Sequence, residues 1–290
     1  MAQIIQSVLE LIGGTPLLAL NQVIEPGSAS VLVKLENRNP SGSVKDRIAL
    51  AIIENVEKQG LISDGSTLVW ATSGNSGVAL AMVAAAKGHR LTIFMPSNAP
   101  LNLRRMVERY GAEVELTAPT LGMQGASEAA TTYAASSSDN LFLDIFNDVQ
   151  ITEAHYKYTA EEIIGATNGG VAAFVAGVGT GGTLTGVGEV LRQRNPEIMI
   201  VAVEPERSPV LRGGRFGLSG IQGIGASFVP GVLNREIYDE VMGVKDEEAY
   251  ELISNALLVT DELPRVWALK GRLAIRLERL EEAAQAFERA

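Results

Sequence analysis

The chain has 290 residues, 46% of them hydrophobic and 20% charged, which is enough for about two globular domains and excludes a disordered or low-complexity chain. Its formal charge of −10 repels a phosphate backbone, so no nucleic-acid partner is expected. Cysteine is absent, which excludes disulfides, thiolate nucleophiles and Cys-ligated metals. Two histidines, His89 and His155, are too few for a His-rich metal site, and we expect no metal.

The start of the chain predicts a cytoplasmic protein. Its first basic residue is Lys34, so the opening MAQIIQSVLELIGG lacks the positive region of a secretory signal. The uncharged stretch 163–188 is rich in glycine and threonine, which would leave backbone groups unpaired in lipid. We therefore predict no membrane span.

In chain order, short apolar runs alternate with helical patterns. Strands are predicted at VLVKLE (31–36), STLVWAT (66–72), RLTIFMP (90–96), AEVELT (112–117), NLFLD (140–144), VAAFVAGV (171–178) and IMIVAVEP (198–205). Helices are predicted from about Val44, in NSGVALAMVAAAKG (75–88), in LNLRRMVERYG (101–111) and in GGTLTGVGEVLRQRN (181–195). The alternation predicts βαβ units, and the continuous apolar runs predict parallel sheets covered by helices on both faces, hence an α/β fold.

The last forty residues, 251–290, have a different pattern. They lack strand runs and are rich in Ala, Leu, Glu and Arg, which predicts a helical tail. Trp267, Gly271, Ala274, Ala283 and Phe287 lie near the spacing of one tetratricopeptide repeat. Any amphipathic helical hairpin with small residues at its crossing explains the pattern equally well. One such unit must pack on another surface to bury its apolar face.

The glycine-rich segment GVGTGGTLTG (177–186) follows an apolar run and opens a predicted helix. Glycines allow a tight turn whose amides face one anion, and the helix dipole adds attraction. The hydroxyls of Thr180 and Thr183 favour a compact monophosphate. No Lys-Ser or Lys-Thr follows, so a nucleoside triphosphatase is disfavoured. The alternative is a turn that merely connects strand to helix.

The same segment leaves an NAD interpretation open. Gly177, Gly179 and Gly182 satisfy G-x-G-x-x-G, and Glu204 lies about twenty residues on, where an acid that binds ribose belongs. Such a match is weak by itself.

The segment ENRNPSGSVKDR (36–47) places Lys45 in the first turn of a predicted helix. The positive end of the helix dipole disfavours an ammonium there. Burial and positive potential lower a lysine pKa and yield an amine able to form a Schiff base. The alternative is a solvated charged face formed by Lys45, Asp46 and Arg47.

The segment ATSGNSG (71–77) lies at another predicted strand-to-helix junction. Its short polar side chains and its glycines form a nest suited to a carboxylate. A helix N-cap would explain one of these polar residues but hardly four.

Together these segments predict a phosphate-bearing cofactor, an amine that bonds it, and a carboxylate pocket. The sequence resembles the cysteine synthase (O-acetylserine sulfhydrylase) family of fold-type II pyridoxal-phosphate enzymes, which are similar to the tryptophan synthase β subunit. The matching stretches are IGGTPLLAL, NPSGSVKDR, ATSGNSGVALA, GAEVELT, AGVGTGGTLTGVG, VAVEPERSPVL and GIQGIGASFVPGVL, in family order over about residues 3–250.

The resemblance implies roles for particular residues. Lys45 would bond pyridoxal 5'-phosphate and move protons at the substrate Cα, and Asn75 would contact the ring hydroxyl. The phosphate would be held by Gly179, Thr180, Gly181, Gly182 and Thr183. The substrate carboxylate would be held by Thr72, Ser73, Gly74 and Ser76. The implied reaction is β-replacement, converting O-acetylserine and sulfide to cysteine and acetate.

The resemblance also implies an organisation of the chain. Residues 1–39 and 149–250 would form a large cofactor-binding domain, and residues 40–148 a small mobile domain. Members are commonly homodimers, so we expect a homodimer whose other partners are an amino-acid substrate and sulfide.

The sequence departs from the family pattern at three places. Ile145 stands where a Gln that binds the substrate carboxylate is expected, and KYTAEE (157–162) replaces a Thr-Thr-Gly-Pro-Glu stretch. After KDEEAYELI (245–253) the expected Gly-Ile-Ser-Ser-Gly-Ala segment, whose serine meets the pyridine nitrogen, is not found. The alternatives are therefore a related enzyme similar to cystathionine β-synthase, a weakly active cofactor-binding relict, and a scaffold acting through the helical tail.

Overall fold

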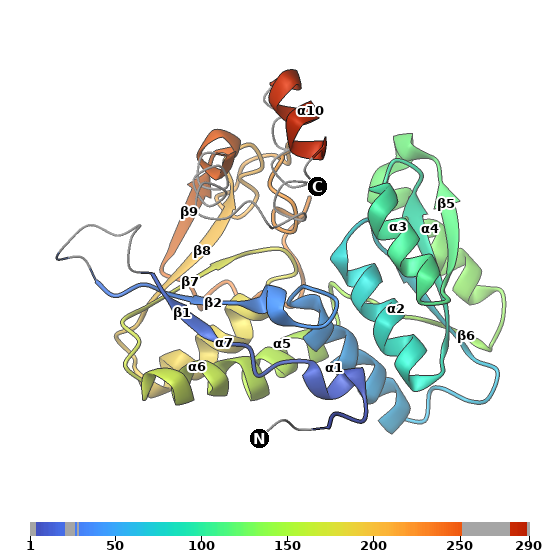
Figure 1. Ribbon diagram of the computed structural model, residues 1–290, viewed down its shortest axis with the longest axis horizontal. Coiled ribbons are helices and arrows are strands. Elements are labelled where there is room, and N and C mark those ends of the chain that lie inside the picture. The colour runs from blue at the N-terminus through green and yellow to red at the C-terminus, as the bar shows by residue number, and fades with distance from the viewer. Residues whose placement is uncertain (1–3, 21–26, 28, 251–278, 289–290) are drawn as a thin grey trace.

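The computed structural model describes residues 4–20, 27, 29–250 and 279–288. Its main elements are two parallel sheets flanked by helices, which confirms the α/β fold class (Figure 1). No helix among the described residues is long and apolar enough to cross a membrane.

The N-terminal segment forms a hairpin that is separate from both parallel sheets. It comprises a 3-10 turn at Val8–Leu11, strands β1 (Leu17–Ala19) and β2 (Leu32–Lys34), and a 3-10 turn at Glu36–Arg38. β1 and β2 pair antiparallel. The prediction that residues 31–36 begin a βαβ unit is therefore wrong, because β2 pairs antiparallel with β1, whereas the strands of a βαβ unit pair parallel.

The first parallel sheet has the strand order β5-β4-β3-β6. Its strands are β3 (Thr67–Ala71), β4 (Arg90–Pro96), β5 (Glu113–Thr117) and β6 (Asn140–Phe142). Its helices are α1 (Lys45–Lys58), α2 (Asn75–Lys87), α3 (Leu101–Arg109) and α4 (Gly122–Ala135), with a 3-10 turn at Pro119–Leu121.

Helices cover both faces of this sheet. Leu68 and Trp70 of β3 pack in one core with α1, α2 and α3, while Val69, which points to the opposite face, packs against α4. This alternation follows from the two-residue period of a strand. The carboxyl end of β3 thereby leads directly into α2, at the segment 71–77.

The second parallel sheet has the order β7-β8-β9. Its strands are β7 (Ala173–Gly177), β8 (Met199–Pro205) and β9 (Glu240–Val244). The associated helices are α5 (Gln150–Ala154), a π-helical turn (His155–Thr159), α6 (Ala160–Thr167) and α7 (Gly182–Arg194). A core that includes Leu184, Val187 and Ile200 joins α7 to β8.

Within the described residues, part of this sheet is exposed. Val175, Met199 and Met242 are exposed, one on each strand. An apolar run cannot distinguish a strand covered on both faces from one covered on a single face, because much of a protein surface is also apolar.

The predicted helical tail falls largely on residues 251–278, which lie outside the described residues. Helix α10 (Leu280–Glu288) is described, and its Ala283 and Ala286 are buried. Tyr250 donates a hydrogen bond to Glu282, and the guanidinium of Arg279 lies 4.7 Å from the centre of the Tyr250 ring. The division into a 40–148 domain and a second domain stays a prediction.

Candidate active site

The glycine turn lies between β7 and α7, as the sequence predicts. Gly181 precedes the helix with φ of 86°, a left-handed conformation that glycine adopts without strain. A side chain at Gly179 would clash with the carbonyl oxygen of Gly223, and one at Gly182 would clash with Ile151. Close packing on both sides therefore fixes the path of this turn.

The backbone of the turn presents unpaired donors. Among the described residues, the N–H groups of Gly179, Thr180 and Gly181 have no hydrogen-bond acceptor. The first N–H groups of α7 also lack partners within the helix. Unpaired amides at the positive end of a helix dipole attract an anion, so the turn has the geometry of an anion cradle.

Lys45 is the first residue of α1, at the end of a loop that is held by hydrogen bonds. Both the backbone N–H and the hydroxyl of Ser41 donate to the carboxylate of Asp46. Gly42 has φ of 84° and donates to the carbonyl of Asn39 over 2.7 Å. The loop therefore presents Lys45 in one defined position.

Burial lowers the pKa of the Lys45 ammonium to about 8. No ion pair with Lys45 is found in the described part of the chain. Desolvation without a compensating carboxylate favours the neutral amine, which is the nucleophilic form.

His155 contacts the glycine turn, which the sequence does not predict. Its Nε2 lies 3.0 Å from Oγ1 of Thr183, and its Nδ1 lies 2.9 Å from Oγ1 of Thr159. Burial, followed by the positive charges of Lys45 and Arg47, lowers the pKa of His155 to about 3. Lys45 is thus within electrostatic range of a histidine that contacts the turn.

The segment 71–77 joins β3 to α2, again as predicted. The hydroxyls of Thr72 and Ser76 lie 2.8 Å apart, and the N–H of Gly74 donates to Thr72 Oγ1 over 3.1 Å. The space beside Gly74 is open, since an added Cβ would meet no atom within 4 Å. Asn75 begins α2 and is exposed.

A partly buried ionic network holds α1 in place. Arg47 donates to both oxygens of Glu36 over 2.7 and 2.9 Å, and to both oxygens of Glu162 over 2.7 Å. Lys34 also donates to Glu162, over 2.6 Å, and the Thr15 hydroxyl donates to Glu36. Hydrogen bonds from Arg47 and Lys34 lower the pKa of Glu162 to about 2 against the opposing effect of its burial. The network joins α1, α6 and β2, and its Arg47 lies two residues after Lys45.

Sequence reasoning missed this network because it links residues more than 100 positions apart. The alternative interpretation of the sequence puts Arg47 with Lys45 on a solvated face, but the Arg47 side chain is almost fully buried. Glu162 belongs to the altered stretch 157–162 and was not given a role. Only the tertiary fold brings the two together.

Ile145 is buried in the core beside α1 and α2. The next residue, Phe146, stacks edge-on against Phe228, with ring centres 4.9 Å apart. The Ile145 side chain has no hydrogen-bond donor, so it offers no polar contact to a carboxylate.

The structure excludes the role of Glu204 as a ribose ligand. Its carboxylate is 1% exposed and accepts hydrogen bonds from the Leu211 N–H and the Arg212 side chain, over 2.7 and 2.9 Å. These bonds occupy the acceptor that a ribose hydroxyl would need.

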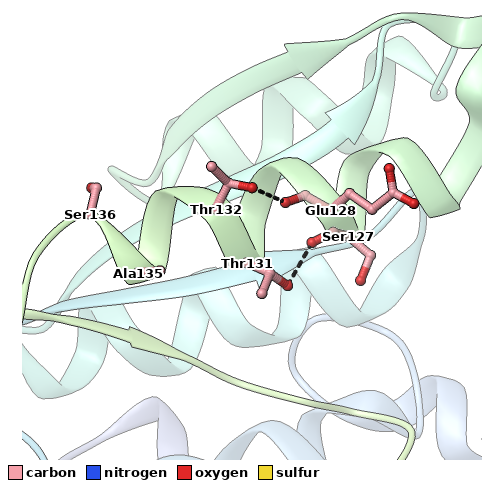
Figure 2. Close-up of a pocket in the computed structure, with 6 residues that line it drawn as sticks. All are labelled: Ser127, Glu128, Thr131, Thr132, Ala135 and Ser136. Carbon is pink, nitrogen blue, oxygen red and sulfur yellow. Dashed lines mark hydrogen bonds between the residues drawn. The ribbon is translucent and has the colours of Figure 1, made fainter.

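A separate hollow of about 590 Å³ lies on the outer side of α4, as Figure 2 shows. Thr131 and Thr132 hydrogen-bond to carbonyls of their own helix there. Their hydroxyl protons are not available to a ligand, and the hollow is not a candidate site. Among the described residues, no cluster of three His, Asp or Glu side chains could hold a metal.

Comparison with known proteins gives a consistent result. The family described as pyridoxal-phosphate dependent enzyme matches residues 8–258. A cysteine synthase of Staphylococcus aureus (strain Mu50) is 44% identical over 251 residues, which are 86% of this chain and 80% of that protein.

Two solved structures are similar to the chain. Cysteine synthase from Entamoeba histolytica has a TM-score of 0.85 and 38% identity, covering 97% of this chain and 83% of that one. An O-ureido-L-serine synthase has a TM-score of 0.85 and 37% identity, covering 88% of this chain and 81% of that one.

Proposed function

The chain belongs to the pyridoxal-phosphate dependent enzyme family, and from this premise we propose that it converts O-acetylserine and sulfide to cysteine and acetate. The observations that support the proposal are a lysine of lowered pKa at the start of α1 and the unpaired backbone amides of the glycine turn. A phosphate-bearing aldehyde requires both an amine of lowered pKa and an anion cradle.

The residues present fit pyridoxal 5'-phosphate. Gly179, Thr180, Gly181, Gly182 and Thr183 would hold the phosphate with the amides at the start of α7. Lys45 would form the covalent bond to the aldehyde, and Asn75 would contact the ring hydroxyl. The bound cofactor supplies an electron sink that stabilises negative charge at the substrate Cα.

The protein's own residues then bind the substrate and move its protons. Thr72, Ser73, Gly74 and Ser76 would hold the substrate carboxylate, supported by the open space beside Gly74. Lys45, freed by the incoming amino group, would take the proton from Cα as a base. It would return that proton after sulfide has replaced acetate at Cβ. A lysine pKa near 8 suits both transfers, because general catalysis works best with a pKa close to the operating pH.

Ile145 reduces the polar contacts available to the substrate. One hydrogen bond fewer to a charged carboxylate corresponds to about 1.5–3 kcal/mol, so we expect a high KM. The alternatives, a related β-replacement enzyme, a weakly active relict and a scaffold, are not favoured by any contact in the described residues.

The experiment is a cysteine assay with added pyridoxal phosphate, O-acetylserine and sulfide. We expect cysteine to form with the wild-type chain and not with Lys45→Ala, which also loses the visible absorbance band of the bound cofactor. Serine plus homocysteine, the substrate pair of the cystathionine-type alternative, serves as the control. Equal turnover by wild type and Lys45→Ala would refute the proposal.

We also propose that the protein is a cytoplasmic homodimer. Leu18, Leu32 and Val33 of the N-terminal hairpin are exposed apolar residues of the kind that subunit interfaces bury, which supports association. Light scattering should give twice the monomer mass, and a monomer at micromolar concentration would contradict this proposal.

A further inference from the structure

His155 occupies a position that the proposed reaction leaves without a role. Its side chain is 2% exposed, and each ring nitrogen faces one threonine hydroxyl, Thr159 on one side and Thr183 on the other. Thr183 lies in the glycine turn, whereas Thr159 lies behind the histidine, away from the turn. The three side chains therefore form a chain of hydrogen bonds that ends at the anion cradle.

Two local features place the imidazole there. His155 begins a π-helical turn that ends at Thr159, and such turns inside helices are frequent at functional sites. Gly186, one turn after Thr183 in α7, faces His155, and a Cβ at this glycine would clash with the Thr152 carbonyl and lie 2.8 Å from the His155 Cβ. The missing side chain lets α7 approach closely enough for Thr183 to reach Nε2.

The proton on the imidazole decides what Thr183 can do. A neutral imidazole has one donor and one acceptor nitrogen. If Nδ1 carries the proton, Nε2 accepts the proton of Thr183, whose oxygen then presents only lone pairs to the cradle. If Nε2 carries the proton, it donates to Thr183 Oγ1, and the Thr183 hydroxyl proton is left for an anion. Thr159 then donates to Nδ1.

We propose that His155 is a positioning residue for the phosphate, held with its proton on Nε2, so that Thr183 donates its hydroxyl proton into the glycine turn. This inference rests on the proposed function for the identity of the anion. The lowered pKa of His155 keeps the imidazole neutral, so that one ring nitrogen is left to accept a hydrogen bond. The hydrogen bond from Thr183 to the phosphate then depends on which ring nitrogen of His155 carries the proton, although His155 itself does not contact the phosphate.

The test compares the affinities of pyridoxal phosphate and pyridoxal for the cofactor-free full chain. Both aldehydes can bond to Lys45, so the ratio of the two dissociation constants isolates the phosphate. In His155→Asn the amide occupies the place of Nδ1 and cannot reach Thr183. In His155→Gln the amide reaches the place of Nε2 and can donate. The two variants carry the same amide group and differ only in the length of the side chain.

We expect His155→Asn to reduce the preference for pyridoxal phosphate about 10- to 100-fold, the range for a hydrogen bond to a charged group. His155→Gln should retain most of the preference. Pyridoxal affinity should be unchanged in both. Thr185→Val is the control, since Thr185 is a buried threonine on the same helix whose hydroxyl accepts from the Asn234 N–H.

A double-mutant cycle gives a second, independent result. After Thr183→Val, His155→Asn should have no further effect on the ratio. Equal losses for both aldehydes, or an unchanged ratio in His155→Asn, would overturn the positioning role while the proposed function stands. Wild-type chain that binds neither aldehyde would overturn the proposed function and this inference together.

Discussion

The charged form of Lys45 lowers the stability of the cofactor-free protein. A lysine whose pKa is lowered from 10.5 to about 8 has lost favourable hydration without gaining a carboxylate partner among the described residues. The unfolded chain binds the proton more tightly than the folded chain does, so the charged amine destabilises the fold at neutral pH. The same desolvation makes the amine reactive.

The first prediction follows directly. Lys45→Met, which keeps the length of the side chain, should raise the free energy of unfolding of the cofactor-free protein at pH 7 by about 1–3 kcal/mol. Urea unfolding measures this change. The exposed Lys157, which pairs with Glu153, is the control position, and Lys157→Met should change stability by less than about 0.5 kcal/mol. A Lys45→Met variant less stable than wild type would contradict the account.

At the scale of residues, the sequence indicates Lys45 as a candidate reactive amine and predicts no role for His155. Lys45 lies in a local segment whose own glycine, proline and serine residues predict a turn into a helix. The partners of His155 depend on a π-helical turn and on close packing of α7, and neither has a signal in a single sequence. The turn from a loop into a helix was predictable from local sequence, and contacts across the fold were not.

At the scale of elements, the contact between α1 and α6 depends on the pair Arg47–Glu162. Arg47 binds Glu162 and Glu36 through two bonds each, and burial of these charges is offset only while all partners are present. Loss of one partner leaves a buried charge partly unpaired. The position of Lys45, two residues before Arg47, depends on the same contacts.

The second prediction is that Glu162→Gln lowers the free energy of unfolding by about 3 kcal/mol, the range for breaking a buried ion pair from one side. Glu161→Gln is the matched control, because Glu161 is the adjacent residue and its pair with Arg194 is exposed. That control should lose less than about 1 kcal/mol. Similar losses in the two variants, measured by urea unfolding, would refute the structural role of the network.

The third prediction concerns how closely two helical elements approach. Gly186→Ala should destabilise the protein by about 1–3 kcal/mol, because its Cβ would overlap the backbone of the segment around His155. Gly165→Ala in α6 meets no atom within 4 Å and should be neutral or stabilise by about 0.5–1 kcal/mol. Thermal unfolding of both variants distinguishes a packing requirement from a general effect of alanine.

Element types were largely predictable, and sheet membership was less so. The runs at 66–72 and 90–96 became neighbouring parallel strands, since both are buried on two faces. The run 31–36 is also apolar, but it contains β2, one of the two antiparallel strands of the N-terminal hairpin. Hydrophobic pattern reports burial and does not specify the partner strand.

For the whole molecule, stability should decrease in acid. Among the groups whose pKa values are lowered are His155, from 6.5 to about 3, and Glu162, from 4.5 to about 2. In both cases the unfolded chain binds more protons than the folded chain between the two pKa values of the group. The stability that each group contributes is therefore fully present above its unfolded pKa, 6.5 for His155 and 4.5 for Glu162, and is lost as pH falls towards its folded pKa. The charges near His155 are those of Lys45, Arg47, Glu36 and Glu162.

The fourth prediction gives the pH profile. Between pH 6.5 and 4.5 the free energy of unfolding should fall with a slope approaching 1.4 kcal/mol per pH unit, because the unfolded state binds one more proton through His155. Urea unfolding at several pH values measures the slope. His155→Asn should flatten the profile in this window. Identical profiles in wild type and His155→Asn would contradict a buried neutral imidazole.

The central claim is that the amine of residue 45 and the glycine turn bind one cofactor molecule. Borohydride reduction of the protein incubated with pyridoxal phosphate, followed by peptide mass analysis, tests it most directly, because reduction fixes the lysine-bound aldehyde permanently. The account predicts a single modified peptide that contains Lys45, with the modification suppressed by excess inorganic phosphate competing for the turn. Modification spread over surface lysines, or an unmodified Lys45, would contradict it.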